Sequence, residues 1–335
     1  MTDTVNLTIA EGEALLERAF AATGVAADAA ASVASALVAA EAEGQVGHGF
    51  SRVADYAAQA RSGKVNCAAH VTTRARGTAS FLTDADCGFA YPALDAARSA
   101  GLSAAEEAGV AVMAVTNSHH CGALSVQVDR IARTGLIGIM VANTPKAIAP
   151  WGAREALFGT NPIAFAVPRH GAEPLVIDLS LSVAARGKVM AAQKAGKRIP
   201  EGWALDATGQ PTTNPEAALA GTMVPIGEAK GTALALMVEV LAAVFTGAAF
   251  SSEASSFFAA GGPAPRVGQT MIAIRPGHGG DFATRLEMLL DQIEALDGAR
   301  LPGTRRLAAL ARARAEGLSV PMQHVEVAER LAAGG

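Results

Sequence analysis

A histidine between two glycines, Gly47-His48-Gly49, is the first feature of the sequence that suggests catalysis. Glycine adopts backbone conformations that other residues resist, so this segment can hold the imidazole in one place. Histidine titrates near neutral pH and can give a proton to a carbonyl oxygen while a hydride reaches the carbon. Arg52 follows about one helical turn later, and its guanidinium can bind a carboxylate through two hydrogen bonds. The pair suits reduction of a 2-oxo acid, and a structural role for both residues is the alternative.

A second polar segment, Asn117–Ala123, contains two adjacent histidines between an expected strand and an expected helix. The turn that enters a helix can present backbone N–H groups to a phosphate. Adjacent histidines also occur in metal sites, but no further ligand stands at a fixed spacing, so we expect no metal here. Packing of a polar loop is the structural alternative.

Further polar clusters stand at the ends of expected strands and the starts of expected helices: Gly159-Thr160-Asn161, Asp178-Leu179-Ser180 and Arg186-Gly187-Lys188. A basic cluster from Arg300 to Arg306 suits a phosphate without being specific for one. The cations of the 186–188 cluster are equally consistent with a solvated helix face, which is where nearby charges usually lie.

Several well-known catalytic motifs are missing from the sequence. No G-x-G-x-x-G follows an expected strand, and the nearest glycine cluster, at 277–280, lacks this spacing. There is also no P-loop, no H-E-x-x-H and no G-x-S-x-G. These absences count against a Rossmann dinucleotide fold, a kinase, a zinc hydrolase and a serine nucleophile.

The hydrophobic pattern predicts a mixed α/β (α+β) protein with helical ends and a central mixed sheet. Expected helices cover residues 9–24, 26–43, 51–61, 91–108, 125–134, 184–195, 230–246 and 282–296. A strand pair is expected from residue 70 onward, and further strands at 110–115, 136–142, 163–167, 175–179 and 271–274.

The composition limits the classes of protein that the chain can belong to. Among its 335 residues 50% are hydrophobic and 17% charged, which is typical of a packed globular enzyme. A net charge of -4 gives no general affinity for nucleic acid. The apolar stretch 232–250 has Glu239 at its middle and reads as a buried core helix, not a membrane span. Without a signal peptide, and with the odd set Cys67, Cys87 and Cys121, we expect a cytoplasmic protein with reduced thiols.

Nine segments in this order resemble the type-2 malate/L-lactate dehydrogenase family, which includes sulfolactate and ureidoglycolate dehydrogenases and the piperideine-2-carboxylate/pyrroline-2-carboxylate reductases. The segments are His48–Arg52, Asn117–His120, Pro150–Gly152, Gly159–Pro162, Asp178, Ala185–Lys188, Ile199–Trp203, Lys230-Gly231 and Leu301–Gly303.

The resemblance implies a non-Rossmann, sulfolactate dehydrogenase-like fold, a homodimer, and NADPH or NADH in an extended groove. It implies that residues 1–70 carry the catalytic histidine and pack with 300–335, while 71–299 bind cofactor and substrate. His48 matches the proton donor, and Arg52 the substrate-carboxylate ligand. Substrate-side positions match Thr160, Arg186 and Gly187, with Lys188 beside them. Cofactor-contacting positions match His120, Cys121, Gly122, Ala123, Leu124, Asp178, Leu179, Ser180, Lys230, Gly231, Pro302, Gly303, Arg305 and Arg306.

Two departures from the family pattern bear on the substrate. Many members have serine before the catalytic histidine, where this chain has Gly47, and the cyclic-imine reductases have His-Gly-Asp where it has Arg186-Gly187-Lys188. Losing an acid and gaining cations favours a substrate with a second negative charge. The leading hypothesis is therefore an NAD(P)-dependent dehydrogenase of a malate-, lactate- or sulfolactate-like 2-hydroxy acid. A cyclic-imine reductase and an inactive nucleotide-binding homologue are the alternatives.

Overall fold

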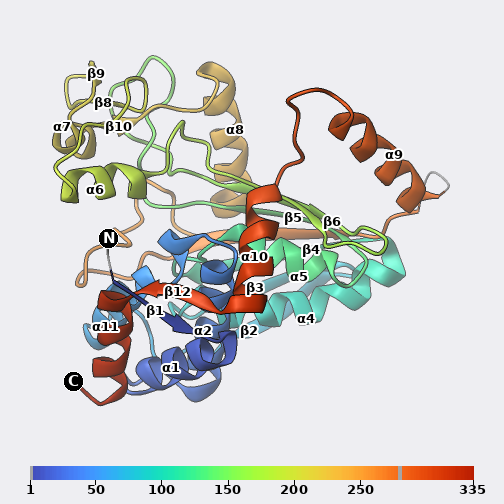
Figure 1. The fold of residues 1–335 in the computed structure, drawn as a ribbon, viewed down its shortest axis with the longest axis horizontal. Coiled ribbons are helices and arrows are strands. Elements are labelled where there is room, and N and C mark those ends of the chain that lie inside the picture. The colour runs from blue at the N-terminus through green and yellow to red at the C-terminus, as the bar shows by residue number, and fades with distance from the viewer. Residues whose placement is uncertain (1–2, 278–280) are drawn as a thin grey trace.

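The computed structural model describes residues 3–277 and 281–335, so most of the glycine cluster at 277–280 lies outside the described residues. A helical layer near the N-terminus consists of α1 (Ile9–Ala21), α2 (Ala27–Ala42) and α3 (Val53–Arg61) (Figure 1). Two 3-10 turns, η1 (Val46–His48) and η2 (Phe50–Arg52), precede α3. The three expected N-terminal helices are confirmed.

A seven-stranded mixed sheet forms the centre, in the order β2-β3-β4-β11-β5-β6-β7, with β3 and β4 parallel and all other neighbours antiparallel. The predicted central sheet and the fold class are thereby confirmed. The strands are β2 (Thr72–Gly77), β3 (Ser80–Asp84), β4 (Val110–Ser118), β5 (Ile137–Ala142), β6 (Ile163–Val167), β7 (Leu175–Leu179) and β11 (Val267–Ile274).

The alternation of side chains along the strands builds two cores, one on each face of the sheet. On β5, Met140 joins the cluster that contains Leu124 of α5 (Leu124–Ala132) and Leu94 of α4 (Ala90–Ala108). The next residue, Val141, joins the cluster that contains Ala235 of α8 (Ala229–Glu239). Helices α4 and α5 therefore cover one face and α8 the other (Figure 1).

A smaller lobe follows β7 along the chain and was not foreseen in detail from the sequence. It contains α6 (Arg186–Lys194), α7 (Pro215–Ala220) and a three-stranded sheet in the order β10-β8-β9. The strands β8 (Ala204–Leu205), β9 (Pro211–Thr212) and β10 (Thr222–Met223) have two residues each, too few to show a hydrophobic period.

The two ends of the chain meet in one antiparallel strand pair. β1 (Thr4–Leu7) pairs with β12 (Leu318–Pro321), and α11 (Met322–Ala332) packs on α1 and α3 (Figure 1). Their buried side chains belong to one hydrophobic cluster with those of α1 to α3. The expected packing of the C-terminal segment on the N-terminal helices is therefore visible, while the division into 1–70 plus 300–335 and 71–299 stays a prediction as a domain boundary.

The apolar stretch 232–250 corrects one expectation. It forms α8 and a π-helical turn, η3 (Val240–Val244), and the acidic side chain of Glu239 is buried as expected. Yet Leu236 and Val244 remain 52% and 58% exposed, so this is not a fully buried core helix. Its second apolar face has no partner within the described chain. Among the residues that the structure describes, no helix is long and apolar enough to cross a membrane.

A buried ion-pair network ties α10 (Thr304–Glu316) to the rest of the protein. The guanidinium of Arg306 lies 2.8 Å from Glu43 Oε1 and 3.5 Å from Asp129 Oδ1, and Arg306 is 8% exposed. Glu43 also accepts a hydrogen bond from the hydroxyl of Ser125 over 2.7 Å. Helices α2, α5 and α10 thus share one set of charges.

Replacing Arg306 with methionine should lower the free energy of unfolding by about 3–5 kcal/mol, because the buried carboxylate of Glu43 loses its cation while Asp129 keeps Arg133. Denaturant unfolding followed by circular dichroism measures the change. Arg305→Met is the matched control, since Arg305 is exposed, and it should shift stability by only about 0.5 kcal/mol. Equal effects of the two substitutions would contradict the structural role of the network.

Candidate active site

The backbone of the loop that carries His48 is hydrogen-bonded to a buried carboxylate. Glu41 on α2 accepts a hydrogen bond from the backbone N–H of Phe50 over 2.8 Å. A side chain on Gly49 would collide with this carboxylate, so glycine is required at that position. At Gly47, a Cβ would meet no atom of the described residues within 4 Å beyond its chain neighbours, so the serine of other family members fits here. Burial raises the pKa of Glu41 to about 7.

Arg52 is fixed next to the same loop. Its Nε donates to the carbonyl oxygen of Gly47 over 2.8 Å, and its guanidinium carbon lies 4.8 Å from the centre of the Phe258 ring. The carboxylate of Asp55 is 3.8 Å from Nη1. Hydrogen bonds to the described residues use Nε, so both Nη groups can bind a carboxylate from a ligand.

His48 and His120 form a pair of nearly parallel rings, with centres 5.3 Å apart and an angle of 22° between the planes. Nδ1 of His48 is buried and lacks a hydrogen-bond partner among the described residues. Burial, followed by the positive charge of Arg52, lowers the pKa of His48 to about 4. The imidazole is therefore neutral at pH 7 before a ligand binds, and one of its two ring nitrogens carries no proton.

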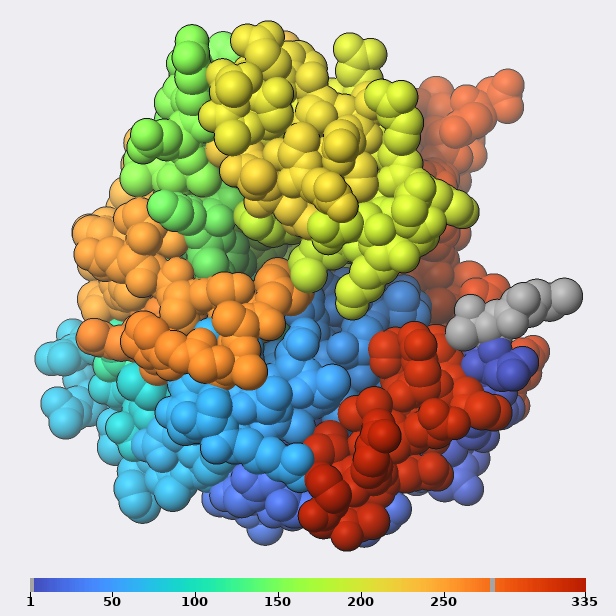
Figure 2. All heavy atoms as spheres, turned by 90° about the vertical axis from the view of Figure 1, so that its left-hand side faces the viewer, coloured from blue at the N-terminus to red at the C-terminus, as the bar shows by residue number. Residues whose placement is uncertain are grey.

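A wall of the site that the sequence did not reveal comes from residues 255–262. Buried Lys64 donates to the carbonyl oxygens of Ser256 and Ala259 over 2.6 and 2.9 Å. This fastening places the ring of Phe257 4.8 Å from that of His120 and brings Phe258 over Arg52. Figure 2 shows this segment (orange) at the surface between the N-terminal helices (blue) and the lobe of residues 150–240 (green to yellow).

Some of the predicted cofactor residues line a cavity of about 600 Å³ between β7, the loop after α2 and the start of α10. Gly303 has a left-handed φ of 80°, and a Cβ there would lie 2.9 Å from the carbonyl oxygen of Val176, so glycine is required. Predicted residues that line the cavity are Asp178, Leu179, Pro302, Gly303, Arg305 and Arg306, and the sequence missed Glu43, Gly44, Gln45 and Ser125.

A carboxylate of the protein itself lies at the N-terminus of α5, and the cofactor contacts expected for residues 120–124 stay a prediction. The N–H of Ser125 donates to Asp178 Oδ2 over 2.8 Å, so a carboxylate of the protein already lies there. Burial raises the pKa of Asp178 to about 6, and nearby Glu43 acts in the same direction. The preceding residues, His120 to Leu124, are buried and run from His48 to this carboxylate. They connect His48 with the 600 Å³ cavity.

The structure separates the remaining predicted residues from that cavity. Gly231 lies in the first turn of α8, where a side chain would collide with the carbonyl of Ile226, and Lys230 beside it is exposed. Thr160 precedes β6, and its N–H donates to Thr144 Oγ1 over 2.9 Å. Ser180 follows β7, and its hydroxyl is 2.8 Å from that of Ser182. Backbone packing explains Gly231 without a ligand, while the roles of the others stay predictions.

The two cations of the 186–188 cluster differ in their surroundings. Arg186 is half-buried and donates from Nη2 to the carbonyl oxygen of Leu219 over 3.1 Å. Lys188 is exposed, and its ammonium lies 5.9 Å from the centre of the Trp203 ring. Both start α6, next to Gly187, which is also exposed. Of the two charges, that of Lys188 is the freer to meet a ligand.

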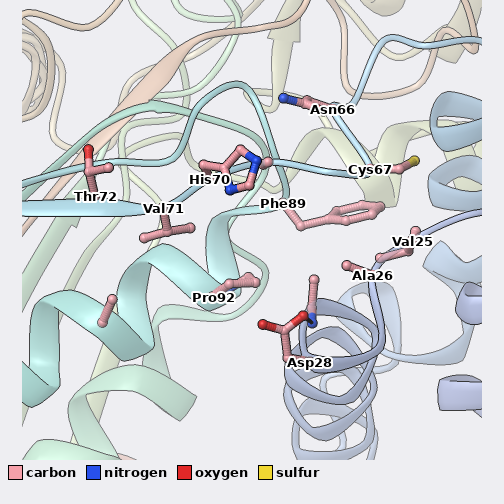
Figure 3. Close-up of a pocket in the computed structure, with 13 residues that line it drawn as sticks. Val25, Ala26, Asp28, Asn66, Cys67, His70, Val71, Thr72, Phe89 and Pro92 are labelled. Carbon is pink, nitrogen blue, oxygen red and sulfur yellow. Dashed lines mark hydrogen bonds between the residues drawn. The ribbon is translucent and has the colours of Figure 1, made fainter.

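A second cavity, of about 560 Å³, contains none of the predicted site residues (Figure 3). Figure 3 shows Asp28, Cys67 and His70 at its rim and the ring of Phe89 at its inner wall. The cavity lies close to the buried ring of His119, because Phe89 lines the cavity and its ring centre is 5.6 Å from that of His119. All three cysteines of the chain are free thiols, as expected.

The structure thus contains a buried histidine beside an arginine and a separate cavity, which is the arrangement that the resemblance predicts for an oxidoreductase site. A model of the malate/L-lactate dehydrogenase family matches residues 7–328. The chain belongs to this family, which confirms the resemblance found in the sequence.

Relatives in the family differ in the substrates that they are named for. A (2R)-3-sulfolactate dehydrogenase (NADP(+)) of Chromohalobacter salexigens is 49% identical over 94% of both chains. A Δ1-pyrroline-2-carboxylate/Δ1-piperideine-2-carboxylate reductase of Pseudomonas syringae pv. tomato is 40% identical over 95% of this chain and 94% of the relative.

Solved structures of the family share the fold over nearly the full length. The Δ1-piperideine-2-carboxylate reductase from Pseudomonas syringae superposes with a TM-score of 0.93 at 38% identity, covering 98% of this chain and all of that one. The sulfolactate dehydrogenase from Methanocaldococcus jannaschii superposes with a TM-score of 0.89 at 27% identity, covering 98% of this chain and 97% of that one. The sulfolactate dehydrogenase-like fold predicted from the sequence is confirmed.

The raised pKa of Glu41 predicts how stability depends on pH. The folded state binds the proton more tightly than the unfolded state, whose value is 4.5, so wild-type stability falls as pH rises from 4.5 to about 7. Glu41→Gln still accepts from Phe50 but cannot ionise. The free energy of unfolding of Glu41→Gln minus that of wild type should therefore be roughly 3 kcal/mol more positive at pH 8 than at pH 4. A pH-independent difference in urea unfolding would rule out this account of Glu41.

Proposed function

We propose that the protein interconverts a 2-oxo acid and its 2-hydroxy acid with NADPH, and that the preferred acid carries a second negative charge. The observation that carries the proposal is the placement of Arg52 beside His48. The hydrogen bond from Nε to the carbonyl oxygen of Gly47, the residue before His48, fixes the guanidinium, and neither Nη group makes a hydrogen bond to the described residues, although Asp55 lies 3.8 Å from Nη1. A 2-oxo acid has its carbonyl one bond from that carboxylate, so its oxygen comes close to His48.

Binding of the acid prepares His48 to give a proton. Burial and, after it, the positive charge of Arg52 hold the pKa of His48 down. A bound carboxylate offsets that charge, so the pKa of His48 rises when the substrate binds. The imidazolium then protonates the C2 oxygen during reduction, and the neutral imidazole takes the proton back during oxidation. Phe257 packs on His120 and Phe258 lies over Arg52, where the two rings would limit access of water.

The cofactor would occupy the 600 Å³ cavity, whose lining fits its chemistry. Arg300, Arg305 and Arg312 supply cations for phosphate groups, and Asp178 and Gln45 supply acceptors and donors for hydroxyl groups. When bound, the nicotinamide supplies the hydride for C2. NADPH is proposed over NADH because of these three arginines, and the NADP(+) dependence named for the 49% identical relative supports this choice.

The second charge of the substrate is assigned to Lys188 at the start of α6. Its ammonium is exposed, whereas Arg186 already donates to Leu219. A carboxylate or sulfonate near Lys188 would also lie at the N-terminal end of a helix, where an anion is stabilised. The 49% identical relative is named for sulfolactate, which carries such a second anion.

The alternatives are separated by one substrate panel. NADPH oxidation is followed with oxaloacetate, sulfopyruvate, pyruvate, and the two cyclic imines named for the 40% identical relative. Turnover of the dianionic acids above pyruvate supports the proposal, and turnover of the imines alone supports a cyclic-imine reductase. Cofactor binding without any turnover supports the inactive homologue, which Gly47 left open in the sequence.

His48→Ala should lower kcat by about 10²–10⁴-fold, which is the usual contribution of a positioned general acid. The Kd of NADPH, measured by fluorescence titration, should change far less, because the cofactor cavity is separate from the histidine. A variant with near-native kcat across the pH range would show that another group donates the proton.

Lys188→Met should reduce the preference for a dianionic acid over pyruvate by roughly 10–150-fold in kcat/KM, the value of one charge-assisted hydrogen bond. Methionine keeps most of the packing of the lysine stem against Trp203 and removes its charge. Lys197→Met, which removes a charge just beyond the other end of α6, is the matched control and should leave the preference unchanged. Equal losses on both substrates would instead indicate structural damage.

The proposed active form is a homodimer. The exposed apolar face of α8 and η3 is continuous, since Leu236, Val240 and Val244 recur every four residues along the helix. Large exposed apolar faces are typical of protein–protein interfaces. A second copy of this chain is the occupant that the family resemblance implies.

Val240→Glu should therefore dissociate the dimer, because the interface would have to bury an unpaired carboxylate. Light scattering should give twice 33.8 kDa for wild type and 33.8 kDa for the variant. Leu296→Glu places the same charge at another strongly exposed leucine, 65% exposed, and should stay dimeric. A wild-type mass of one chain in an active sample would contradict the proposal.

A further inference from the structure

The two tyrosines of the chain lie side by side behind the catalytic pair. Tyr56 and Tyr91 are 0% and 1% exposed, and their hydroxyl oxygens are 3.1 Å apart. The hydroxyl of Tyr56 is also 2.6 Å from Nδ1 of His120. The mechanism described above uses neither hydroxyl, so this buried chain of three polar groups calls for another explanation.

Counting donors and acceptors decides which way the hydrogen bonds run. If Nδ1–H of His120 donated to Tyr56, then Tyr56 would donate to Tyr91, and the proton of Tyr91 would have no acceptor among the described residues. A buried donor without an acceptor costs about 1–3 kcal/mol. In the other direction, Tyr91 donates to Tyr56, Tyr56 donates to Nδ1 of His120, and each hydroxyl proton is bonded. The second arrangement is therefore favoured.

This direction fixes the tautomer of His120. A neutral imidazole that accepts at Nδ1 carries its proton on Nε2. Burial raises the pKa of Tyr56 and of Tyr91 and lowers that of His120, so all three groups stay neutral near pH 7. Nε2 of His120 makes no hydrogen bond within the described chain and is not sealed from solvent, whereas both ring nitrogens of His119 are sealed and unpaired.

We propose that Tyr56 and Tyr91 are positioning residues that hold His120 as a fixed Nε2–H donor beside His48. The inference rests on the proposed function. The donor would bind an acceptor oxygen of the substrate or of the nicotinamide amide while His48 moves the proton. Nδ1 of His120 accepts from Tyr56 and Nε2 already carries a proton. His120 therefore cannot accept a proton in place of His48, although the two rings are stacked 5.3 Å apart. The two imidazoles thus have separate tasks.

The tautomer can be observed directly, without turnover. Long-range ¹H–¹⁵N NMR of protein labelled at its seven histidines, with His120→Gln used for assignment, should show His120 protonated at Nε2. In Tyr56→Phe the signals should shift to a mixture of both tautomers. Tyr91→Phe keeps the Tyr56–His120 bond and loses its fixed direction, so it should shift less. An Nδ1–H form in wild type, or an unchanged His120 in Tyr56→Phe, would overturn the proposal.

Kinetics then test whether the fixed donor matters for the reaction. Tyr56→Phe should lower kcat roughly tenfold with little change in the KM for NADPH, as expected for one lost hydrogen bond. The amide of His120→Gln keeps a donor near the Nε2 position, so Tyr56→Phe should cost nothing further in that background. Multiplying losses would assign Tyr56 to packing alone and refute the proposal. If no 2-oxo acid or imine is turned over at all, the proposed function fails, while the NMR result still reports on His120.

Discussion

The active site depends on a buried ammonium group, that of Lys64, and on the carbonyl groups that it binds. A charge at 2% exposure is costly unless it is bonded, and here it donates to the carbonyls of residues 256, 259 and 261. The segment fastened in this way carries Phe257 and Phe258 onto His120 and Arg52. Burial and, after it, the positive charge of Arg52 lower the pKa of both His48 and His120, so both imidazoles are neutral without a ligand.

The parts of this site that the sequence predicted are those whose cause is local. Gly49 is needed because Glu41 lies against it, and glycines around His48 were visible as a pattern. The strands of the main sheet were long enough to show their apolar content. The attachment of the 255–262 segment to Lys64 was not visible in the sequence, since Lys64 is separated by 192 residues from its first carbonyl partner, and no periodicity links such distant positions. The same holds for β1 and β12, two short strands from opposite ends.

Charged residues show a further limit of sequence reasoning, because a sequence lists charges without their partners. Arg305 and Arg306 are neighbours in one basic cluster, yet successive residues on a helix point about 100° apart. Both line the same cavity, but Arg305 is exposed, whereas Arg306 is buried between Glu43 and Asp129. Asp178 is predicted at the cofactor site, and in the structure it also accepts a hydrogen bond from the first turn of α5. To separate these cases from the sequence, one would have to know the exact first residue of each helix.

The pairing of β1 with β12 has a consequence for the birth of the protein on the ribosome. The helices that carry His48 and Arg52 are made first, but their shared core needs Leu318, Val320 and Val325 from the last part of the chain. At about 5–20 residues per second, the nascent N-terminal layer waits roughly 15–60 s for these residues. During that time its apolar surface is open to solvent and to chaperones. The loop that carries His48 therefore gains its final support only after residues 318–325 have been made.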